Sequence, residues 1–243
     1  MQARAKRERD SAKHQATGRS HEEPKEVNMV KDCGRSFLLV ILLAALPLTA
    51  WAQDAKTVLS KAAKAMGAEN LRTLQYSGSG STYDEKGQHI QLKSYSRQID
   101  LNATTSSVRM TRVLGTPPAD QTLNETVAAS SPWNAQFDFW ISPYGFLKGA
   151  MANTATVESK SAYGEPYRIV TFTLPGNHKV VGYINDKDMV ERVQTWVDNE
   201  VMIEGVYREY ADFGGLKVPT IVIQNRGGQL AQVVIVKDAK PNG

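Results

Sequence analysis

From residue 71 to its end, the chain alternates short runs rich in Val, Ile, Thr and Tyr with turn signals. An interval of roughly ten residues between turns is typical of strands that pair with their neighbours in an antiparallel meander. The sequence therefore predicts a mostly β chain with one large sheet. The turn signals read DEKG (84–87), PGN (175–177), NDKD (185–188), GG (214–215) and RGG (226–228).

Alternation of side chains sets the expected strand bounds. His89, Gln91, Lys93 and Tyr95 are placed on one face, with Ile90, Leu92 and Ser94 on the other. Residues 115–132, with Pro117 and Pro118, are expected to be a loose connection. The predicted strands are Arg72–Tyr83, Gln88–Ile99, Thr104–Leu114, Tyr167–Leu174, His178–Ile184, Met189–Val197, Val206–Phe213, Val218–Gln224 and Leu230–Val236.

The last two strands contain the runs Thr220–Ile223 and Val233–Val236, which are apolar at successive positions. A strand that is apolar on both faces is typical of the covered centre of a sheet. Both strands are therefore expected to be central and covered on each side.

Three helices are expected. The first runs from Asp54, as its N-cap, to Met66, and Gly67 ends it. The second lies near Gln136–Ile141, and the third covers Pro143–Ala152, with Ser142 as N-cap and proline at the first helical position. The predicted fold is α+β and mostly β: a curved antiparallel sheet with helices on its concave face.

The N-terminal part contains a predicted signal peptide at residues 29–52. Lys31 and Arg35 precede a 14-residue apolar run, 37–50, and Ala50-Trp51-Ala52 provides small residues at a cleavage site. The run is shorter than the roughly 20 residues that a membrane-spanning helix needs. We therefore expect cleavage after Ala52, a single domain at 53–243, and a periplasmic or secreted protein.

Residues 1–28 are polar and have no apolar period. Either translation begins at Met29 and this leader is not native, or it is the cytoplasmic tail of an uncleaved signal anchor. Cys33 precedes the apolar run, and Gln53 stands where a lipid-anchored protein needs cysteine. No lipid anchor is expected, and contact with the membrane is expected to be transient.

Charge and cysteine content exclude several classes of function. The chain has 29 basic and 25 acidic residues, of which 9 basic and 6 acidic residues precede Gln53. Residues 53–243 therefore carry 20 basic and 19 acidic residues. The basic pI of about 9.0 therefore comes mostly from the leader and does not indicate nucleic-acid binding. Residues 53–243 contain no cysteine, so this part has no thiolate nucleophile, no disulfide and no cysteine-ligated metal.

A search for catalytic and metal motifs finds none. His89 and His178 have no partner at a zinc-ligand spacing, and G-x-S-x-G does not occur. The GSGS run at 78–81 lacks the third glycine of a nucleotide loop and is interpreted as a flexible or closely packed strand. Asp186 and Asp188 are interpreted as turn residues rather than calcium ligands. No catalytic residue, metal or cofactor is predicted.

Aromatic residues concentrate between Trp133 and Phe146. Helices that carry them across a curved sheet would either fill its concave face as core or line a cavity for an apolar ligand. Both interpretations stay open. The candidate ligand contacts are Phe137, Trp140, Tyr144 and Phe146.

Four segments resemble a bacterial exported domain: KAMGAENL (64–71), LQYSGSG (74–80), WISPYGFLK (140–148) and YADFGGLKVP (210–219). In that family the domain commonly precedes a metallo-β-lactamase-fold hydrolase domain. The resemblance covers nearly all of residues 55–241 and implies a half-barrel closed by helices, similar to the LolA and LppX lipoprotein carriers. The zinc motif H-x-H-x-D-H of the hydrolase is absent, so its metal chemistry is assigned to no residue here.

The first functional hypothesis is a non-catalytic periplasmic module that binds a lipid or another hydrophobic ligand. The second is an accessory or interaction domain of a metallo-β-lactamase-fold hydrolase, stand-alone or truncated. A third is an enzyme whose site assembles from distant carboxylates and His89 or His178.

Overall fold

The computed structural model describes residues 47–102, 107–198 and 200–243. The chain divides into two compact units, Met1–Leu43 and Ala44–Gly243, of which the second is described here. The predicted leader 1–28 and residues 29–46 of the predicted signal peptide lie outside the described residues. No helix among the described residues combines the length and apolarity needed to span a bilayer.

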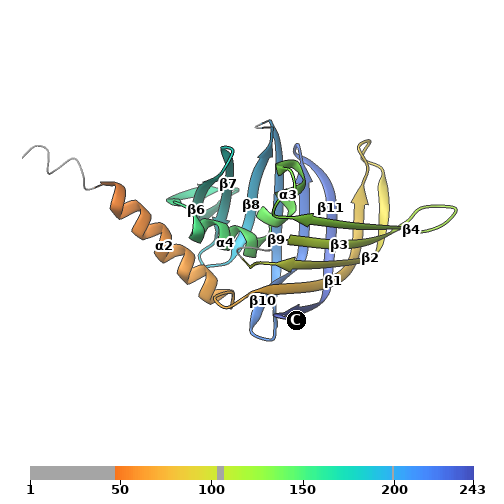
Figure 1. Ribbon diagram of the computed structural model, residues 1–243, viewed down its shortest axis with the longest axis horizontal. Helices are drawn as coiled ribbons and strands as arrows, with labels where there is room; N and C mark the ends of the chain where they lie inside the picture. Colours follow the sequence, from red (N-terminus) through yellow and green to blue (C-terminus); the bar gives the residue numbers. More distant parts are fainter. Residues whose placement is uncertain (1–46, 103–106, 199) are drawn as a thin grey trace, which may run out of the picture. The chain divides into compact units, whose positions relative to one another are not determined.

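The described residues form three helices and an 11-stranded antiparallel sheet (Figure 1). The helices are α2 (Pro47–Ala65), α3 (Trp133–Trp140) and α4 (Pro143–Ala152). The strands are β1 (Thr73–Tyr83), β2 (His89–Asp100), β3 (Ser107–Gly115), β4 (Gln121–Ala128), β5 (Thr156–Ala162), β6 (Glu165–Leu174), β7 (His178–Ile184), β8 (Val190–Val197), β9 (Val201–Phe213), β10 (Leu216–Arg226) and β11 (Gln229–Pro241).

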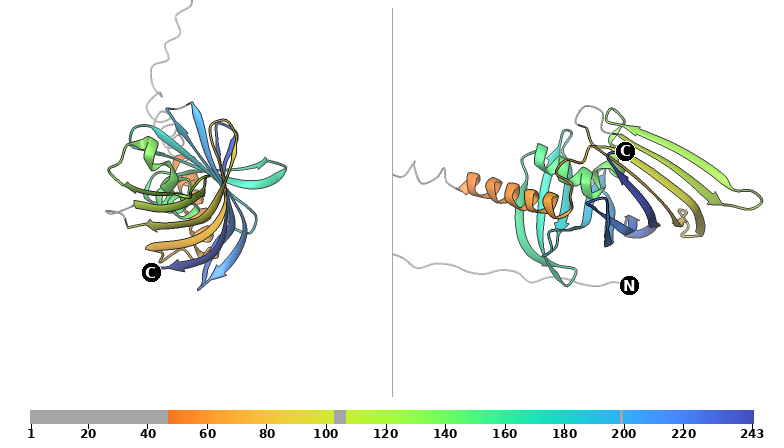
Figure 2. Two further views of the ribbon diagram at one scale, coloured as in Figure 1. Left: turned by 90° about the vertical axis from the view of Figure 1, so that its right-hand side faces the viewer. Right: turned by 90° about the horizontal axis from the view of Figure 1, so that it is seen from below.

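The strand order is β4-β3-β2-β1-β11-β10-β9-β8-β7-β6-β5, so the sheet consists of two meanders. They join where β1 pairs with β11, from Leu74 opposite Pro241 to Thr82 opposite Gln232. Between the meanders, α3 and α4 connect the β4 edge to the β5 edge. Figure 2 shows the sheet curving around these two helices, so the predicted curved antiparallel sheet with helices on its concave face is confirmed.

The close approach of β1 to β11 requires glycine at positions 78 and 80. A Cβ at Gly78 would lie 2.0 Å from the carbonyl oxygen of Ile235, and one at Gly80 would lie 2.0 Å from that of Val233. The pairing of β1 shifts register at these glycines, as a β-bulge does. The interpretation of GSGS as a closely packed strand is therefore confirmed.

The main errors in strand prediction concern the sheet edges and register. β4 and β5 form the two edges. β4 falls in the segment 115–132 that was expected to be a loose connection, and β5 falls in a segment for which no strand was predicted. In β2, a register shift between Leu92 and Ser94 places Tyr95 on the same buried face as Leu92, against the predicted alternation. The pairing β10–β11 is central, but its outer face is not covered, because Ile235 is 42% exposed.

The predicted helix bounds match the observed ones closely for α4 and less well for α2 and α3. α4 spans the predicted Pro143–Ala152, and Ser142 Oγ accepts a hydrogen bond from the Gly145 amide, as expected of an N-cap. α3 begins three residues earlier than predicted. α2 begins at Pro47, so Asp54 lies within the helix and is not its N-cap.

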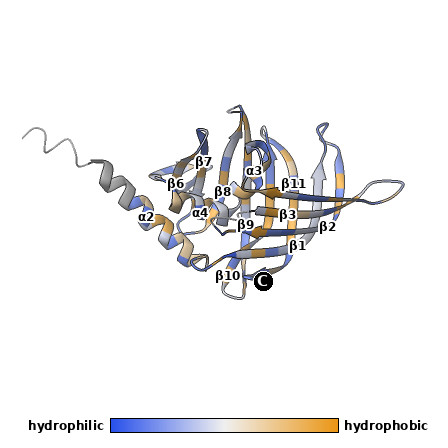
Figure 3. Ribbon diagram, viewed as in Figure 1, coloured by the Kyte–Doolittle hydropathy of each residue, from blue (hydrophilic) through white to orange (hydrophobic). Residues whose placement is uncertain are grey.

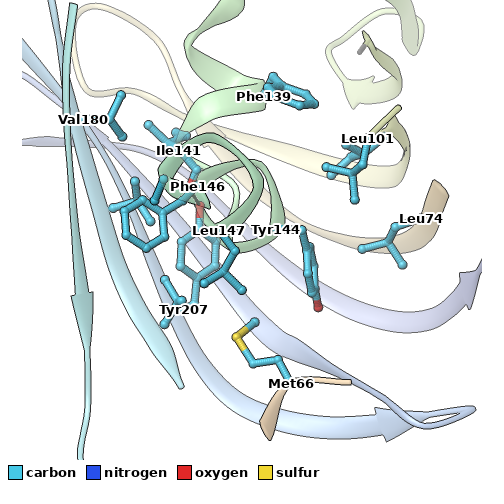
Figure 4. Close-up of a cluster of buried hydrophobic side chains, with 14 of the residues drawn as sticks. Met66, Leu74, Leu101, Phe139, Ile141, Tyr144, Phe146, Leu147, Val180 and Tyr207 are labelled. Atoms are coloured by element: carbon cyan, nitrogen blue, oxygen red, sulfur yellow. Dashed lines mark hydrogen bonds between the residues drawn. The ribbon is translucent and has the colours of Figure 1, made fainter. Parts of the chain in front are cut away.

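The core lies between the concave face of the sheet and the helices. Figure 3 shows apolar residues interspersed with polar ones along β1, β2 and β3, as expected for strands with one covered face. Figure 4 shows Tyr144, Phe146 and Leu147 of α4 among side chains from the strands. Each fully buried Leu or Phe contributes about 1.5–3 kcal/mol through removal of apolar surface from water.

Candidate functional site

A solvent-accessible cavity of about 660 Å³ lies on the concave side of the sheet, beside α3. Its lining includes Ile203 of β9, Gln224 of β10 and Gln232 of β11. Side chains alternate along a strand, so Gln224 shares a face with Val222, and Gln232 shares one with the buried Val234. The cavity therefore continues the surface that the helices cover elsewhere.

One side of the cavity is polar and internally paired. Arg112 on β3 and Glu125 on β4 form an ion pair, with Nη2 and Oε2 3.0 Å apart. On α3, the Asp138 carboxylate accepts a hydrogen bond of 3.1 Å from the Gln224 amide. Arg112 Nε is buried and has no hydrogen-bond partner within the described residues. This side can orient a polar group.

The lining also contains apolar side chains. Phe137 of α3 is half-buried, Ile203 of β9 is fully buried, and Leu230 of β11 is 40% exposed. A cavity lined by both polar and apolar groups suits an amphiphilic ligand, which has one part of each kind.

Arg97 of β2 anchors the C-terminal end of α3 to the sheet. It is 5% exposed, its Nη1 donates to the Tyr76 hydroxyl at 3.3 Å, and Nη2 donates to the backbone carbonyl of Asp138. Burial disfavours the charged guanidinium, but Tyr76, Tyr95 and Asp138 outweigh it and raise the pKa of Arg97. A permanent positive charge at the C-terminal end of α3 also complements the helix dipole.

The structure separates the four predicted contacts. Phe137 alone among them lines the 660 Å³ cavity. Trp140 borders a different pocket of about 130 Å³, and its indole Nε1 donates to Gln136 at 3.2 Å. Tyr144 and Phe146 are 3% and 0% exposed and pack in the core. As ligand contacts, all four stay a prediction, and the geometry favours Phe137.

Among the described residues, neither His89 nor His178 belongs to a cluster of side chains that could hold a metal ion. His89 Nε2 lies 2.9 Å from Ser81 Oγ, and His178 stacks on Trp133 with ring centroids 4.1 Å apart. Asp188, at the predicted turn, forms an ion pair of 2.7 Å with Arg168. Across residues 47–102, 107–198 and 200–243, no three His, Cys, Asp or Glu side chains gather as metal ligands would.

Sequence reasoning missed the polar side of the cavity. Gln224 and Gln232 sit at positions where the same face of each strand carries Val222 and Val234. A polar residue on an otherwise apolar strand face was the available signal. It could not be interpreted without knowing which strands are neighbours.

Comparison with known proteins identifies the fold only. No family model matches the chain, and no curated protein matches it. A DUF1329 family protein from Desulfovibrio piger is 10% identical, with a TM-score of 0.50 over 77% of this chain and 93% of that one. A LolA superfamily protein from Nitrosomonas europaea is 14% identical, with a TM-score of 0.46 over 78% and 94%.

Proposed function

We propose that the protein is a non-catalytic binding module for an amphiphilic ligand, of which a lipid is the simplest class. The observation that carries the proposal is the mixed lining of the 660 Å³ cavity, which combines the apolar side chains Phe137 and Leu230 with the paired groups of Arg112, Glu125 and Asp138. The predicted cavity for an apolar ligand is thereby refined to one whose lining also carries polar groups.

Binding would follow from burial and orientation. The volume falls within the roughly 300–1,000 Å³ that is usual for small-molecule sites. Apolar ligand surface laid on Phe137 and Leu230 would contribute about 25 cal/mol per Å² removed from water. The head group would lie toward Arg112 and Glu125, whose opposite charges favour a ligand that carries hydrogen-bonding or zwitterionic groups.

Export belongs to the same proposal. An exported protein that collects an amphiphile from a bilayer would touch the membrane only while loading, in agreement with the predicted signal peptide at 29–52. A partnership with a metallo-β-lactamase-fold hydrolase rests on the resemblance alone, and no observation in the structure favours it.

Native mass spectrometry tests the proposal directly. The protein is exported to the bacterial periplasm, purified without detergent and measured before and after incubation with phosphatidylethanolamine–phosphatidylglycerol vesicles. The expected result is an added mass that organic extraction identifies as an amphiphile. An unliganded mass that stays unchanged after incubation would contradict the proposal.

Two variants assign the added mass to the cavity. Phe137→Ala should reduce the bound fraction several-fold, because the ring belongs to the apolar part of the lining. Met151→Ala, at a 48% exposed position on the neighbouring helix, is the matched control and should retain the ligand. Equal retention by both variants would place the ligand elsewhere.

A further inference from the structure

A second cavity, of about 410 Å³, lies on the opposite face of the sheet from the first. Val193 of β8 is fully buried and pairs with Gly182 under α4, so its neighbour Arg192 faces the other way. Ile203 of β9 lines the first cavity, so Glu204 likewise faces outward. The outer face therefore carries its own site, independent of the proposed function.

A buried ion pair underlies this second cavity. Glu204 is 5% exposed, and its carboxylate accepts bonds from Arg192 at 2.6 Å, Gln194 at 2.7 Å and Asn225 at 2.9 Å. Burial alone would raise the pKa of Glu204, but these donors outweigh it and lower the pKa. The carboxylate stays charged and fixes Arg192 in place.

Tyr163, in the turn between β5 and β6, holds an exposed ring against Arg192. The ring is 58% exposed, and the guanidinium carbon lies 3.8 Å from its centroid. The hydroxyl of Tyr163 accepts a bond of 2.8 Å from Gln194, and Tyr183 meets the ring edge-on at 5.6 Å. Tyr163 also adopts a left-handed φ of 52°, which non-glycine residues rarely do.

The opposite wall of the cavity is fixed by Glu191. Its two carboxylate oxygens accept bonds from the Tyr167 hydroxyl and the Asn185 amide, each at 2.7 Å. Because these groups are held by one another, little conformational entropy remains to be lost when a ligand binds.

The lining carries charges of both signs. Three acidic residues, Glu165, Asp186 and Glu191, stand beside the basic Lys187 and Arg208, while the charge of Arg192 is neutralised by Glu204 beneath the cavity. Val206 is the aliphatic member of a lining that is otherwise polar or aromatic. Such a cavity selects neither a charged ligand nor an acyl chain.

We infer that the outer cavity binds a neutral polyhydroxylated ligand, a saccharide unit. The face of a sugar ring would rest on the face of the Tyr163 ring opposite the one that Arg192 covers. Its hydroxyl groups would bond to Asn185, Glu191 and Arg208, planar groups that can engage neighbouring hydroxyls in pairs. Arg192, already neutralised by Glu204, serves as a positioning residue that holds Tyr163 in place.

The test is amide chemical-shift mapping of the full-length exported protein with maltose, cellobiose and N,N′-diacetylchitobiose. At least one probe should shift the amides of 163–165, Tyr167 and 185–192 with an affinity in roughly the millimolar range. Inorganic phosphate serves as the anionic control and should leave them unmoved. Failure of all three probes at about 20 mM, or equal shifts with phosphate, would overturn the inference.

Variants complete the test. Tyr163→Asn removes the ring while asparagine tolerates the left-handed φ, and it should weaken binding by about tenfold. Tyr163→Phe keeps the ring and should stay within about threefold of the parent. Phe137→Ala, on the other face, should bind the sugar unchanged. Unaltered binding by Tyr163→Asn, or shifts centred on Phe137, would contradict the outer site.

Discussion

The ring of Phe146 occupies the space that a side chain on Gly182 would need. A Cβ built on Gly182 would lie 2.1 Å from Cζ of Phe146, far closer than atoms can pack. The ring is fully buried and also meets Phe172, with centroids 5.9 Å apart. α4 is therefore seated on β7 by one aromatic residue that fits against one glycine.

The first prediction follows from this contact. Gly182→Ala should destabilise the protein by about 2 kcal/mol, because the ring or the strand must move to admit the methyl group. Gly115→Ala is the control, since the nearest atom there is Cε of the flexible Lys93 side chain at 3.1 Å. Urea unfolding measures both. Equal urea midpoints for the two variants would show that α4 moves to admit the methyl group without loss of stability.

Phe146→Ala should lower the free energy of unfolding by about 3–5 kcal/mol, as expected for loss of a fully buried phenyl ring. Trp140 is half-buried, so Trp140→Ala should leave the fold intact. Thermal unfolding followed by circular dichroism compares the two variants. A larger loss for Trp140→Ala would place the centre of the core beside α3 instead.

Ser142→Ala should cost about 1–2 kcal/mol, because the N-cap of α4 disappears. Ser142 Oγ accepts from the Gly145 amide at 3.0 Å and donates to the Phe139 carbonyl at 2.7 Å, both in a buried setting. Ser159→Ala on the exposed edge strand β5 is the control and should be close to neutral. Equal unfolding midpoints for Ser142→Ala and Ser159→Ala would show that the N-cap does not contribute to stability.

Glu204→Gln should destabilise the protein at pH 7 by about 2 kcal/mol, less than for a fully buried pair, because Arg192 retains partial solvent access. The pKa of Glu204 is lowered in the folded state, so its contribution is present above the unfolded pKa of about 4.3 and lost as pH falls through the folded value.

The gap between wild type and Glu204→Gln should therefore narrow below about pH 4. Urea unfolding of both proteins at neutral and acidic pH measures this difference, in which the other titrating groups largely cancel. A gap that is constant with pH would mean that the lost contact is steric and not electrostatic.

Trp133→Phe should cost about 1 kcal/mol, because the indole Nε1 donates a 2.9 Å bond to the Trp196 carbonyl that phenylalanine cannot make. The stack on His178 can persist with a phenyl ring. Hydrogen exchange should report faster opening at the start of α3. Unchanged protection there would show that the stack alone holds the helix.

Local signals explain the elements that could be predicted. Ser142 and Pro143 mark the start of α4 because a cap and a proline at the first position act within one turn of helix. His178–Ile184 was delimited at both ends by turn residues. Such signals do not depend on which strands are neighbours.

Elements at the borders of the sheet could not be predicted in the same way. β4 carries Leu123 and Val127 among polar residues, and β5 carries Val157 and Ala162. An edge strand buries little on either face, so its sequence lacks the apolar period that identifies a strand. Conversely, Ile221 and Ile235 face outward on central strands, where the sequence suggested cover on both sides.

The candidate site could likewise be predicted only in part from the sequence. The aromatic segment was correctly placed on the concave face, but sequence could not separate Phe137, at the cavity, from Phe146, in the core. That difference depends on what each ring meets across the sheet, such as Gly182 for Phe146. Tyr163 and Glu204 raised no signal because their partners come from several strands.

The pairing of β1 with β11 has a consequence for how the chain folds. During synthesis β1 is the first strand to emerge and its partner β11 the last, so this pairing can form only after nearly the whole chain has emerged. Pairing of Leu74 with Pro241 then completes the middle of the sheet, not its border. Until then β1 exposes an unpaired backbone edge, and export machinery or a chaperone would meet the protein as two halves.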